Sequence, residues 1–214
     1  MEHDQQELDA RIRAATALRA LSHAIIAHDV DLDVLDDIAR SAEGLLGPVE
    51  AAPDRTHPFR RVGSFAMPTP GEKGDEPTHL FADSIVSGTA NPMGMNATLW
   101  RDQGEAVMKV VLGPAHEGAP GRAHGGLVAA LIDETMGLVL GIIQTPAFTG
   151  RLTVTYRAPT PLGVELTGTA RVVEQKGRKI SMTAEVHAGD TLIAEGEALF
   201  IAVAPEQFIR ASVE

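Results

Sequence analysis

The sequence predicts an α+β fold in which one long buried helix is wrapped by an antiparallel sheet, with a helical extension at the N-terminus. Residues 5–28 and 31–47 carry apolar side chains at helical spacing, whereas short runs after about residue 80 alternate apolar and polar residues. Between these runs lies one almost continuous apolar segment, residues 127–143. A single helix of this kind hides its surface only if a sheet curves around it.

The N-terminal 50 residues are predicted to form a helical hairpin. The apolar positions of the first helix are Leu8, Ile12, Ala15, Leu18, Leu21 and Ile25, and those of the second are Leu35, Ile38, Ala42 and Leu45. Asp31 or Asp33 can cap the second helix, and Gly47-Pro48 is predicted to end it. We expect the apolar stripe to pack on another element, either as a packing or dimerisation appendage or as a regulatory or partner-binding segment.

The remaining elements follow from turn signals and alternation. Residues 51–78 are rich in Pro, Gly and charge and indicate a linker or wrapping loop. Residues 80–88 are a short strand candidate, and residues 96–102 and 105–113 form a predicted hairpin around Gln103-Gly104. After the helix, an antiparallel meander is predicted over these segments: 152–159, 164–175, 179–188 and 191–203.

Composition excludes several classes of protein. The 214 residues contain no cysteine, so disulfides, thiolate metal sites and a cysteine nucleophile are excluded. The net charge is −11, of which residues 1–50 carry −7, from 4 basic and 11 acidic side chains. Without a basic stripe, a signal core or a clear membrane span, we expect a cytoplasmic protein that binds neither nucleic acid nor membrane.

The chemistry is concentrated where the apolar helix begins. His124-Gly125-Gly126 opens it, and Asp133 and Glu134 are its only carboxylates. The first N–H groups of a helix lack internal partners and carry the positive end of the dipole, which suits a developing oxyanion. A carboxylate in so apolar a helix is costly unless something there needs it. One segment therefore offers an oxyanion site at its start and an acid in its body.

The spacing of these residues adds a geometric constraint. His124 and Asp133 are nine residues apart, which is about 2.5 turns and roughly 13 Å along a helix. They therefore lie on opposite faces, and one substrate carbonyl cannot readily touch both. If both serve one reaction, the acid must come from a second copy of the helix.

Familiar catalytic patterns are missing from the chain. It contains no G-x-S-x-G, no H-E-x-x-H, no P-loop and no G-x-G-x-x-G, and its histidines lack metal-ligand spacing. We therefore expect no metal site and no α/β-hydrolase nucleophile.

The segment Glu117-Gly-Ala-Pro-Gly121, two residues, His124-Gly-Gly126 and an acid at Asp133 resembles the hotdog-fold acyl-CoA thioesterases. The resemblance is strongest to the branch of phenylacetic-acid-pathway and carboxyl-terminal-modulator-like thioesterases. Residues 149–159 (TGRLTVTYRAP) also resemble the strand that follows the central helix in that family. The match covers roughly residues 80–204 and leaves the N-terminal helices outside.

The resemblance implies a hotdog fold, a homodimer or homotetramer with sheets joined edge to edge, and hydrolysis of a CoA thioester without a further cofactor. Gly125 or Gly126 would donate the N–H that polarises the thioester carbonyl. Asp133 of the partner subunit would attack or activate water, and Thr149 would help to place that water. Some relatives have Asn where this chain has Gly118, so a side-chain amide has no role at that position.

Each candidate residue also has a structural interpretation. His124 can fix the loop by hydrogen bonding, Asp133 can cap another element, and for Glu134 a surface or interface ion pair is favoured over catalysis. Asn91 can bind substrate or simply shape a turn. The basic residues that are candidates for holding coenzyme A phosphates, or are otherwise solvated hairpin charges, are Arg157, Lys176, Arg178 and Lys179.

These observations define four segments and three functions. Residues 1–50 are the helical extension, 51–78 the linker or wrapping loop, 79–205 the thioesterase domain and 206–214 a C-terminal tail. The first function is acyl-CoA or aryl-CoA hydrolysis, and an alternative is a non-catalytic acyl-CoA-binding protein. A hydratase or dehydratase is disfavoured because residues 90–94 (ANPMG) lack the Asp and His of the D-x-N-P-x-H type motif that such activity resembles.

Overall fold

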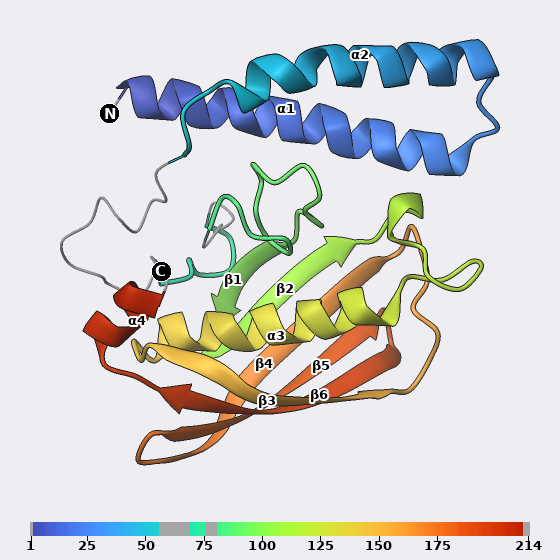
Figure 1. The fold of residues 1–214 in the computed structure, drawn as a ribbon. Helices are drawn as coiled ribbons and strands as arrows, with labels where there is room; N and C mark the ends of the chain where they lie inside the picture. The colour runs from blue at the N-terminus through green and yellow to red at the C-terminus, as the bar shows by residue number, and fades with distance from the viewer. Residues whose placement is uncertain (1, 56–68, 76–80, 212–214) are drawn as a thin grey trace.

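The computed structural model describes residues 2–55, 69–75 and 81–211 of the chain. Two helices at the N-terminus lie above a body in which a single helix rests on one curved sheet (Figure 1). Most of the predicted linker, residues 56–68 and 76–78, lies outside the described residues. The predicted C-terminal tail overlaps a short helix, α4 (Pro205–Ala211).

The sheet is six-stranded and antiparallel throughout, in the order β1-β2-β4-β5-β6-β3. Its strands are β1 (Thr98–Asp102), β2 (Glu105–Val111), β3 (Ala147–Tyr156), β4 (Glu165–Lys176), β5 (Lys179–Ala188) and β6 (Thr191–Ala202). The predicted hairpin at Gln103-Gly104 is confirmed. Both turn residues have positive φ, 51° and 86°, as a tight two-residue hairpin turn requires. The order leaves β3 at one edge of the sheet, where its outer side pairs with no strand of the described residues.

The central helix α3 (Gly125–Ile142) lies on the concave face of the sheet, as the apolar run predicts (Figure 1). Its side chains Leu131, Ile132 and Met136 are fully buried. The approach of helix to sheet is so close that a Cβ on Gly196 of β6 would lie 2.4 Å from Ile132 Cγ2. By length and composition α3 would also pass for a membrane span, contrary to the reading of the sequence, but its packing makes it the core helix.

The strand predicted over residues 80–88 is wrong for its described part, which forms a series of turns. The Ser84 hydroxyl accepts a hydrogen bond from the Val86 N–H at 3.1 Å, and the Gly88 N–H donates to the Ser84 carbonyl at 3.1 Å. Serine side chains that bond to nearby backbone in this way compete with a strand ladder.

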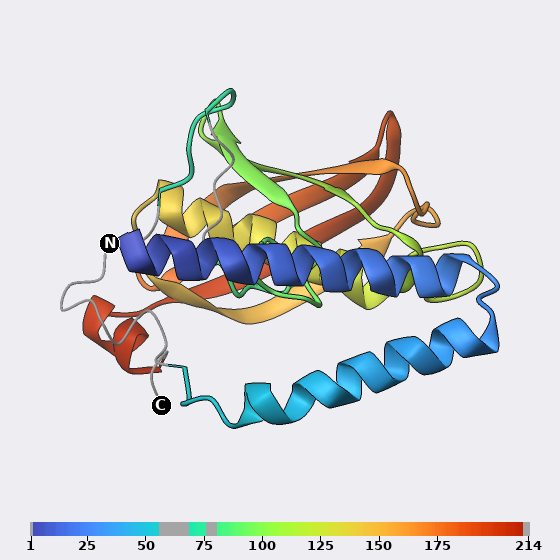
Figure 2. The same cartoon turned by 90° about the horizontal axis from the view of Figure 1, so that it is seen from above.

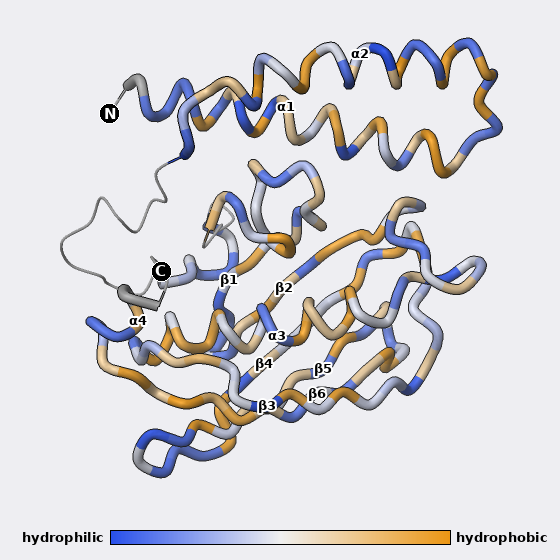
Figure 3. The backbone as a smooth tube through the Cα atoms, in the orientation of Figure 1, coloured by the Kyte–Doolittle hydropathy of each residue, from blue (hydrophilic) through white to orange (hydrophobic). Residues whose placement is uncertain are grey.

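The N-terminal helices differ in how they pack. In α1 (Glu2–Ala27), Ala15 faces the body and is only 2% exposed. In α2 (Leu32–Glu50) no side chain is buried, and Leu45 and Val49 of its apolar stripe are 65% and 69% exposed. Figure 2 shows α2 splayed away from α1, and Figure 3 shows the apolar positions that recur along it. The expectation that the hairpin stripe packs on another element therefore holds only in part for α1, where Leu18 and Leu21 are 51% and 39% exposed, and is wrong for α2 within this chain.

The predicted end of the second helix is also wrong. Pro48 lies inside α2, which continues to Glu50. A proline lacks only its own N–H, so the helix loses one hydrogen bond near its end while the Ala51 N–H still reaches the Gly47 carbonyl at 3.0 Å.

Candidate active site

The start of α3 leaves one backbone donor free. His124 is the N-cap, and its Nδ1 accepts a hydrogen bond from the Gly126 N–H at 3.0 Å. The ring is therefore placed with Nδ1 as acceptor, and the Gly126 N–H is occupied. The Gly125 N–H has no acceptor among the residues that the structure describes. Of the two predicted oxyanion donors, Gly125 is the available one.

His124 is fixed from several sides. Its backbone N–H donates to the His116 carbonyl at 2.9 Å, and the preceding Ala123 N–H donates to Thr160 at 3.0 Å. Gly118 packs directly on it: a Cβ at position 118 would lie 2.7 Å from His124 Cα and 3.2 Å from its Cδ2. A side chain at position 118 would therefore displace His124.

A surface pocket of about 510 Å³ opens at this end of α3. His124, Gly125, Tyr156 and Arg157 line it. The Tyr156 hydroxyl donates to the Gly125 carbonyl at 2.7 Å, and the Arg157 Nε donates to Glu195 at 2.6 Å. The structure therefore brings the predicted phosphate ligand Arg157 together with the glycine-led helix start, although Glu195 already takes one of its donors.

The acid lies in a second pocket. The Thr149 hydroxyl donates to Asp133 Oδ1 at 2.9 Å, which joins two predicted catalytic residues. Both line a cavity of about 210 Å³ whose other walls include four phenylalanines, Phe81, Phe148, Phe200 and Phe208. The rings of Phe148 and Phe208 stack with centroids 4.9 Å apart. As the nine-residue spacing predicts, Asp133 and His124 do not line one cavity of this chain.

Sequence reasoning missed the aromatic residues of both pockets. Tyr156 and Thr149 are seven positions apart on β3, a spacing that simple alternation places on opposite faces. The irregularity between Thr149 and Arg151 lets both side chains reach α3, and nothing in the sequence indicates it. Phe148 and Phe208 are 60 positions apart in the sequence, and only the return of β6 beside β3 brings them together.

Glu134 makes no ion pair with the residues that the structure describes. Its carboxylate accepts hydrogen bonds from the Ser84 hydroxyl, at 2.9 and 3.0 Å to its two oxygens, and from the Ser87 hydroxyl. These contacts hold the loop at 84–87 against α3. A surface ion pair is not formed within the described residues, because Ser84 and Ser87 rather than a basic side chain face this carboxylate, and an ion pair across a subunit interface stays a prediction.

Three other predicted binding residues lie away from the helix start. The Asn91 side chain is engaged in its own loop, donating to the Asp83 carbonyl at 3.0 Å and accepting from the Met93 N–H at 2.8 Å. Arg178 and Lys179 lie at the β4–β5 turn, where the Arg178 Nε donates to the Ala202 carbonyl at 2.9 Å. That turn is at the opposite end of β5 and β6 from Arg157.

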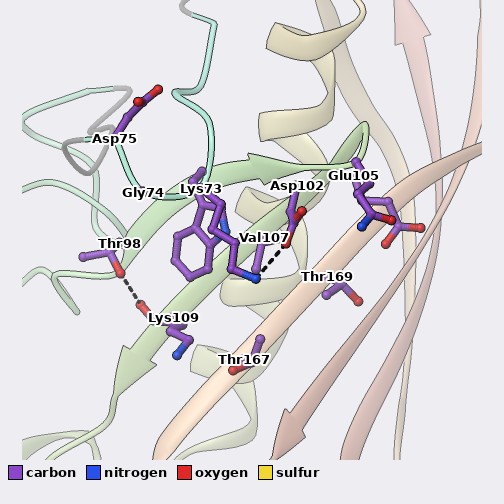
Figure 4. Close-up of a pocket in the computed structure, with 12 residues that line it drawn as sticks. Lys73, Gly74, Asp75, Thr98, Asp102, Glu105, Val107, Lys109, Thr167 and Thr169 are labelled. Carbon is purple, nitrogen blue, oxygen red and sulfur yellow. Dashed lines mark hydrogen bonds and ion pairs between the residues drawn. The ribbon is translucent and has the colours of Figure 1, made fainter.

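A hollow of about 720 Å³ lies on the outer face of β1, β2 and β4 (Figure 4). It contains none of the predicted site residues. Its lysines are already paired, Lys73 with Asp102 at 3.0 Å and Lys109 with Glu165 at 2.6 Å, so the hollow offers little free positive charge. In the described part of the chain, no cluster of three or more His, Asp or Glu side chains could hold a metal ion.

A helix with a free glycine N–H at its start, wrapped by this antiparallel sheet, defines a hotdog-fold protein. The family model described as "Thioesterase superfamily" matches residues 120–195. Acyl-coenzyme A thioesterase 13 of Homo sapiens is 32% identical over 98 residues, which cover 44% of this chain and 69% of that protein. The chain belongs to the thioesterase superfamily.

Two further relatives are one longer protein and one solved structure of similar extent. Acyl-coenzyme A thioesterase THEM4 of Xenopus laevis is 37% identical over 95 residues, 44% of this chain and 43% of that protein, so the chain spans less than half of this relative. A crystal structure of a thioesterase superfamily protein is 25% identical, with a TM-score of 0.72, and the match covers 89% of this chain and 94% of that one. A match of that extent must include much of the N-terminal helices, so the extension is not peculiar to this chain.

Proposed function

We propose that this chain hydrolyses an acyl- or aryl-coenzyme A thioester to the free acid and coenzyme A. The observation that carries the proposal is the free Gly125 N–H at the start of α3, with Asp133 held by Thr149 further along the same helix. The names of the relatives, which are acyl-coenzyme A thioesterases, support the substrate class.

The Gly125 N–H supplies the oxyanion donor. It lies at the N-terminus of an 18-residue helix, where the aligned peptide dipoles place partial positive charge. A thioester carbonyl oxygen gains negative charge when its carbon is attacked, so a preformed donor there stabilises the transition state more than the substrate. The Tyr156 hydroxyl donates to the Gly125 carbonyl and so helps to hold the following peptide, Gly125–Gly126, at the start of the helix.

The acid comes from a second copy of the chain. Along β3, Thr149 lies near the start, beside Asp133, and Tyr156 is the last residue, beside Gly125. β3 is an edge strand, and an antiparallel pairing with its own copy about a two-fold axis sets the start of one β3 against the end of the other. This pairing brings the acid pocket of each chain to the helix start of its partner.

The reaction then balances with one water. Asp133 either attacks the thioester carbon, giving an acyl-enzyme anhydride that water hydrolyses, or removes a proton from water that attacks directly. In both routes the carbon–sulfur bond breaks and the coenzyme A thiolate leaves and takes up a proton. The Thr149 hydrogen bond occupies Oδ1, so Oδ2 is the oxygen free to act.

The pockets suggest how the two ends of the substrate are held. The phenylalanine-lined cavity beside Asp133 suits the acyl or aryl group. Arg157 beside Gly125 is our candidate for binding the coenzyme A phosphates, and Arg178 and Lys179 lie at the other end of the sheet, where β3 begins. Asn91 would act only through the loop that it shapes.

The test is thiol release from short, medium, long and aryl coenzyme A thioesters by wild type, Asp133→Asn and Asp190→Asn. Asp190 is an exposed turn acid and serves as the matched control. We expect kcat to fall by about 100-fold or more in Asp133→Asn and to be unchanged in the control. Full activity in a folded Asp133→Asn variant would remove this acid from the mechanism. If wild type turns over no thioester yet binds coenzyme A by calorimetry, the chain is a non-catalytic acyl-CoA-binding protein.

A further inference from the structure

Helix α1 contacts both loops that flank the proposed site, although it lies outside the residues matched by the family model. Two of its polar side chains reach the body, Arg19 and His23. They are four residues apart and therefore share one face of the helix. Each forms hydrogen bonds with the backbone of a different loop of the body, and each loop leads to a residue of the site.

His23 engages the short helix η2 (Pro114–His116) that precedes the glycine-led segment. Its Nδ1 accepts a hydrogen bond from the Ala115 N–H at 3.0 Å, and its ring meets the His116 ring edge-on with centroids 4.8 Å apart. The fit is close, because a Cβ on Gly113 would lie 2.7 Å from His23 Nδ1. No side chain larger than hydrogen is compatible with His23 in this place.

The contact continues directly to the oxyanion site. The carbonyl of His116 accepts the His124 N–H at 2.9 Å, and His124 Nδ1 in turn caps the Gly126 N–H at 3.0 Å. The imidazole of His116 also accepts the Gly113 N–H at 3.2 Å, which ties the η2 turn to itself. Two hydrogen bonds thus separate the α1 side chain His23 from the residue that sets the direction of the Gly125 N–H.

Arg19 makes the second connection. Its Nη1 donates to the Thr89 carbonyl at 3.1 Å and to the Asn91 carbonyl at 2.6 Å. The same loop carries Ser84 and Ser87, whose hydroxyls hold Glu134 of α3. Arg19 therefore anchors the loop that packs against the middle of α3, next to Asp133.

We propose that α1 is a positioning element of the active site and that His23 is its main positioning residue, holding η2 and His124 so that the Gly125 N–H points at the thioester oxygen. The proposal rests on the function proposed above. A positioning role differs from a general packing role in what it changes: an oxyanion donor acts in the transition state, so its misplacement lowers kcat and leaves KM nearly unchanged.

The experiment compares His23→Ala, His23→Asn and His28→Ala in the full chain. Asn can place its Oδ1 where His23 Nδ1 accepts the Ala115 N–H, and His28 is an exposed histidine just beyond α1 that makes no hydrogen bond or ion pair with the described residues. We expect His23→Ala to lower kcat by about 10- to 100-fold with KM little changed, because a shift of about 1 Å at a reacting centre has an effect of that order. His23→Asn should recover most of the loss, and His28→Ala should match wild type.

A second readout separates this proposal from the hydrolytic function. Amide hydrogen exchange at His124 should be faster in His23→Ala than in wild type and His28→Ala, since its N–H is bonded to the His116 carbonyl that His23 holds in place. If wild type hydrolyses no thioester while this difference is present, the proposed function fails and the link from α1 to His124 stands. If His23→Ala matches His28→Ala in both exchange and kcat, or if His23→Asn loses as much activity as His23→Ala, the positioning role is refuted.

Discussion

The Gly125 N–H can be removed without removing the residue's place in the helix. Gly125 is the first residue of α3, a position at which proline is favoured because its missing N–H has no partner within the helix. The residue before a proline must be extended, and His124 already is, with φ −66° and ψ 129°. Gly125→Pro is therefore expected to fold and to lack only the proposed oxyanion donor.

A second variant, Gly125→Ala, isolates the contribution of the Gly125 N–H to kcat. A Cβ at position 125 meets Tyr156 Cζ and Oη at 3.3 Å, a contact that this side chain, 51% exposed, can relieve by a few tenths of an ångström. Gly125→Ala adds the same Cβ and keeps the N–H, so the ratio of the two variants reports the donor alone. Loss of one oxyanion donor lowers kcat by about 100- to 1000-fold, or about 2.7–4 kcal/mol of transition-state stabilisation.

The assay is steady-state thiol release on the best substrate of the coenzyme A thioester panel, with folding checked by thermal unfolding. We expect Gly125→Ala to remain within a few-fold of wild type and Gly125→Pro to lose about 100-fold or more beyond it. If Gly125→Pro and Gly125→Ala both fold and are equally active, the assignment of the Gly125 N–H as the oxyanion donor is refuted.

Two further predictions concern the loop before α3. Gly118→Ala should lower kcat by about 10-fold or more, because its Cβ would displace His124, which would lie 2.7 Å away. Gly44→Ala, a helical glycine with nothing within 4 Å, should leave kcat unchanged, and parity of the two variants would contradict the argument. Burial, and then repulsion from His23, lowers the pKa of His116 from its usual value of 6.5. The unfolded chain then binds the proton at higher pH than the folded chain, so the free energy of unfolding should fall as pH drops below about 6.5 toward the lowered pKa. His116→Asn, which keeps an acceptor for Gly113, should flatten this dependence in denaturant titrations between about pH 8 and 5, and an unchanged slope would contradict it.

The sequence predicts the fold well where local pattern and tertiary packing agree. Strand β5 is found at its predicted bounds, Lys179–Ala188, because alternation along it matches burial on one face. The single apolar helix fits only a wrapping sheet, and the structure has that sheet. The strand prediction for residues 80–88 was wrong because serine side chains stabilise turns there. Their partner Glu134 is about 50 positions away in the sequence.

The candidate site was predictable where it depends on spacing within one element. His124 and Asp133 are separated along α3 by helical geometry alone, and they indeed line different pockets. Which glycine N–H is free was not predictable, because it depends on the ring of His124 turning back to Gly126. The role of α1 was equally inaccessible, since its contact with η2 joins His23 to Ala115 across 92 positions.

The central claim is that one active site combines the helix start of one chain with the acid of another. Mixing two inactive variants, Gly125→Pro and Asp133→Asn, tests it directly. After subunit exchange by mild denaturation and refolding, half of the dimers are hybrids, and each hybrid has one site with both groups intact. We expect the mixture to recover about a quarter of wild-type activity, because half of the dimers are hybrids and half of the sites in each hybrid are intact. A mixture as inactive as its parents, with hybrid dimers shown by mass spectrometry, would contradict the shared site.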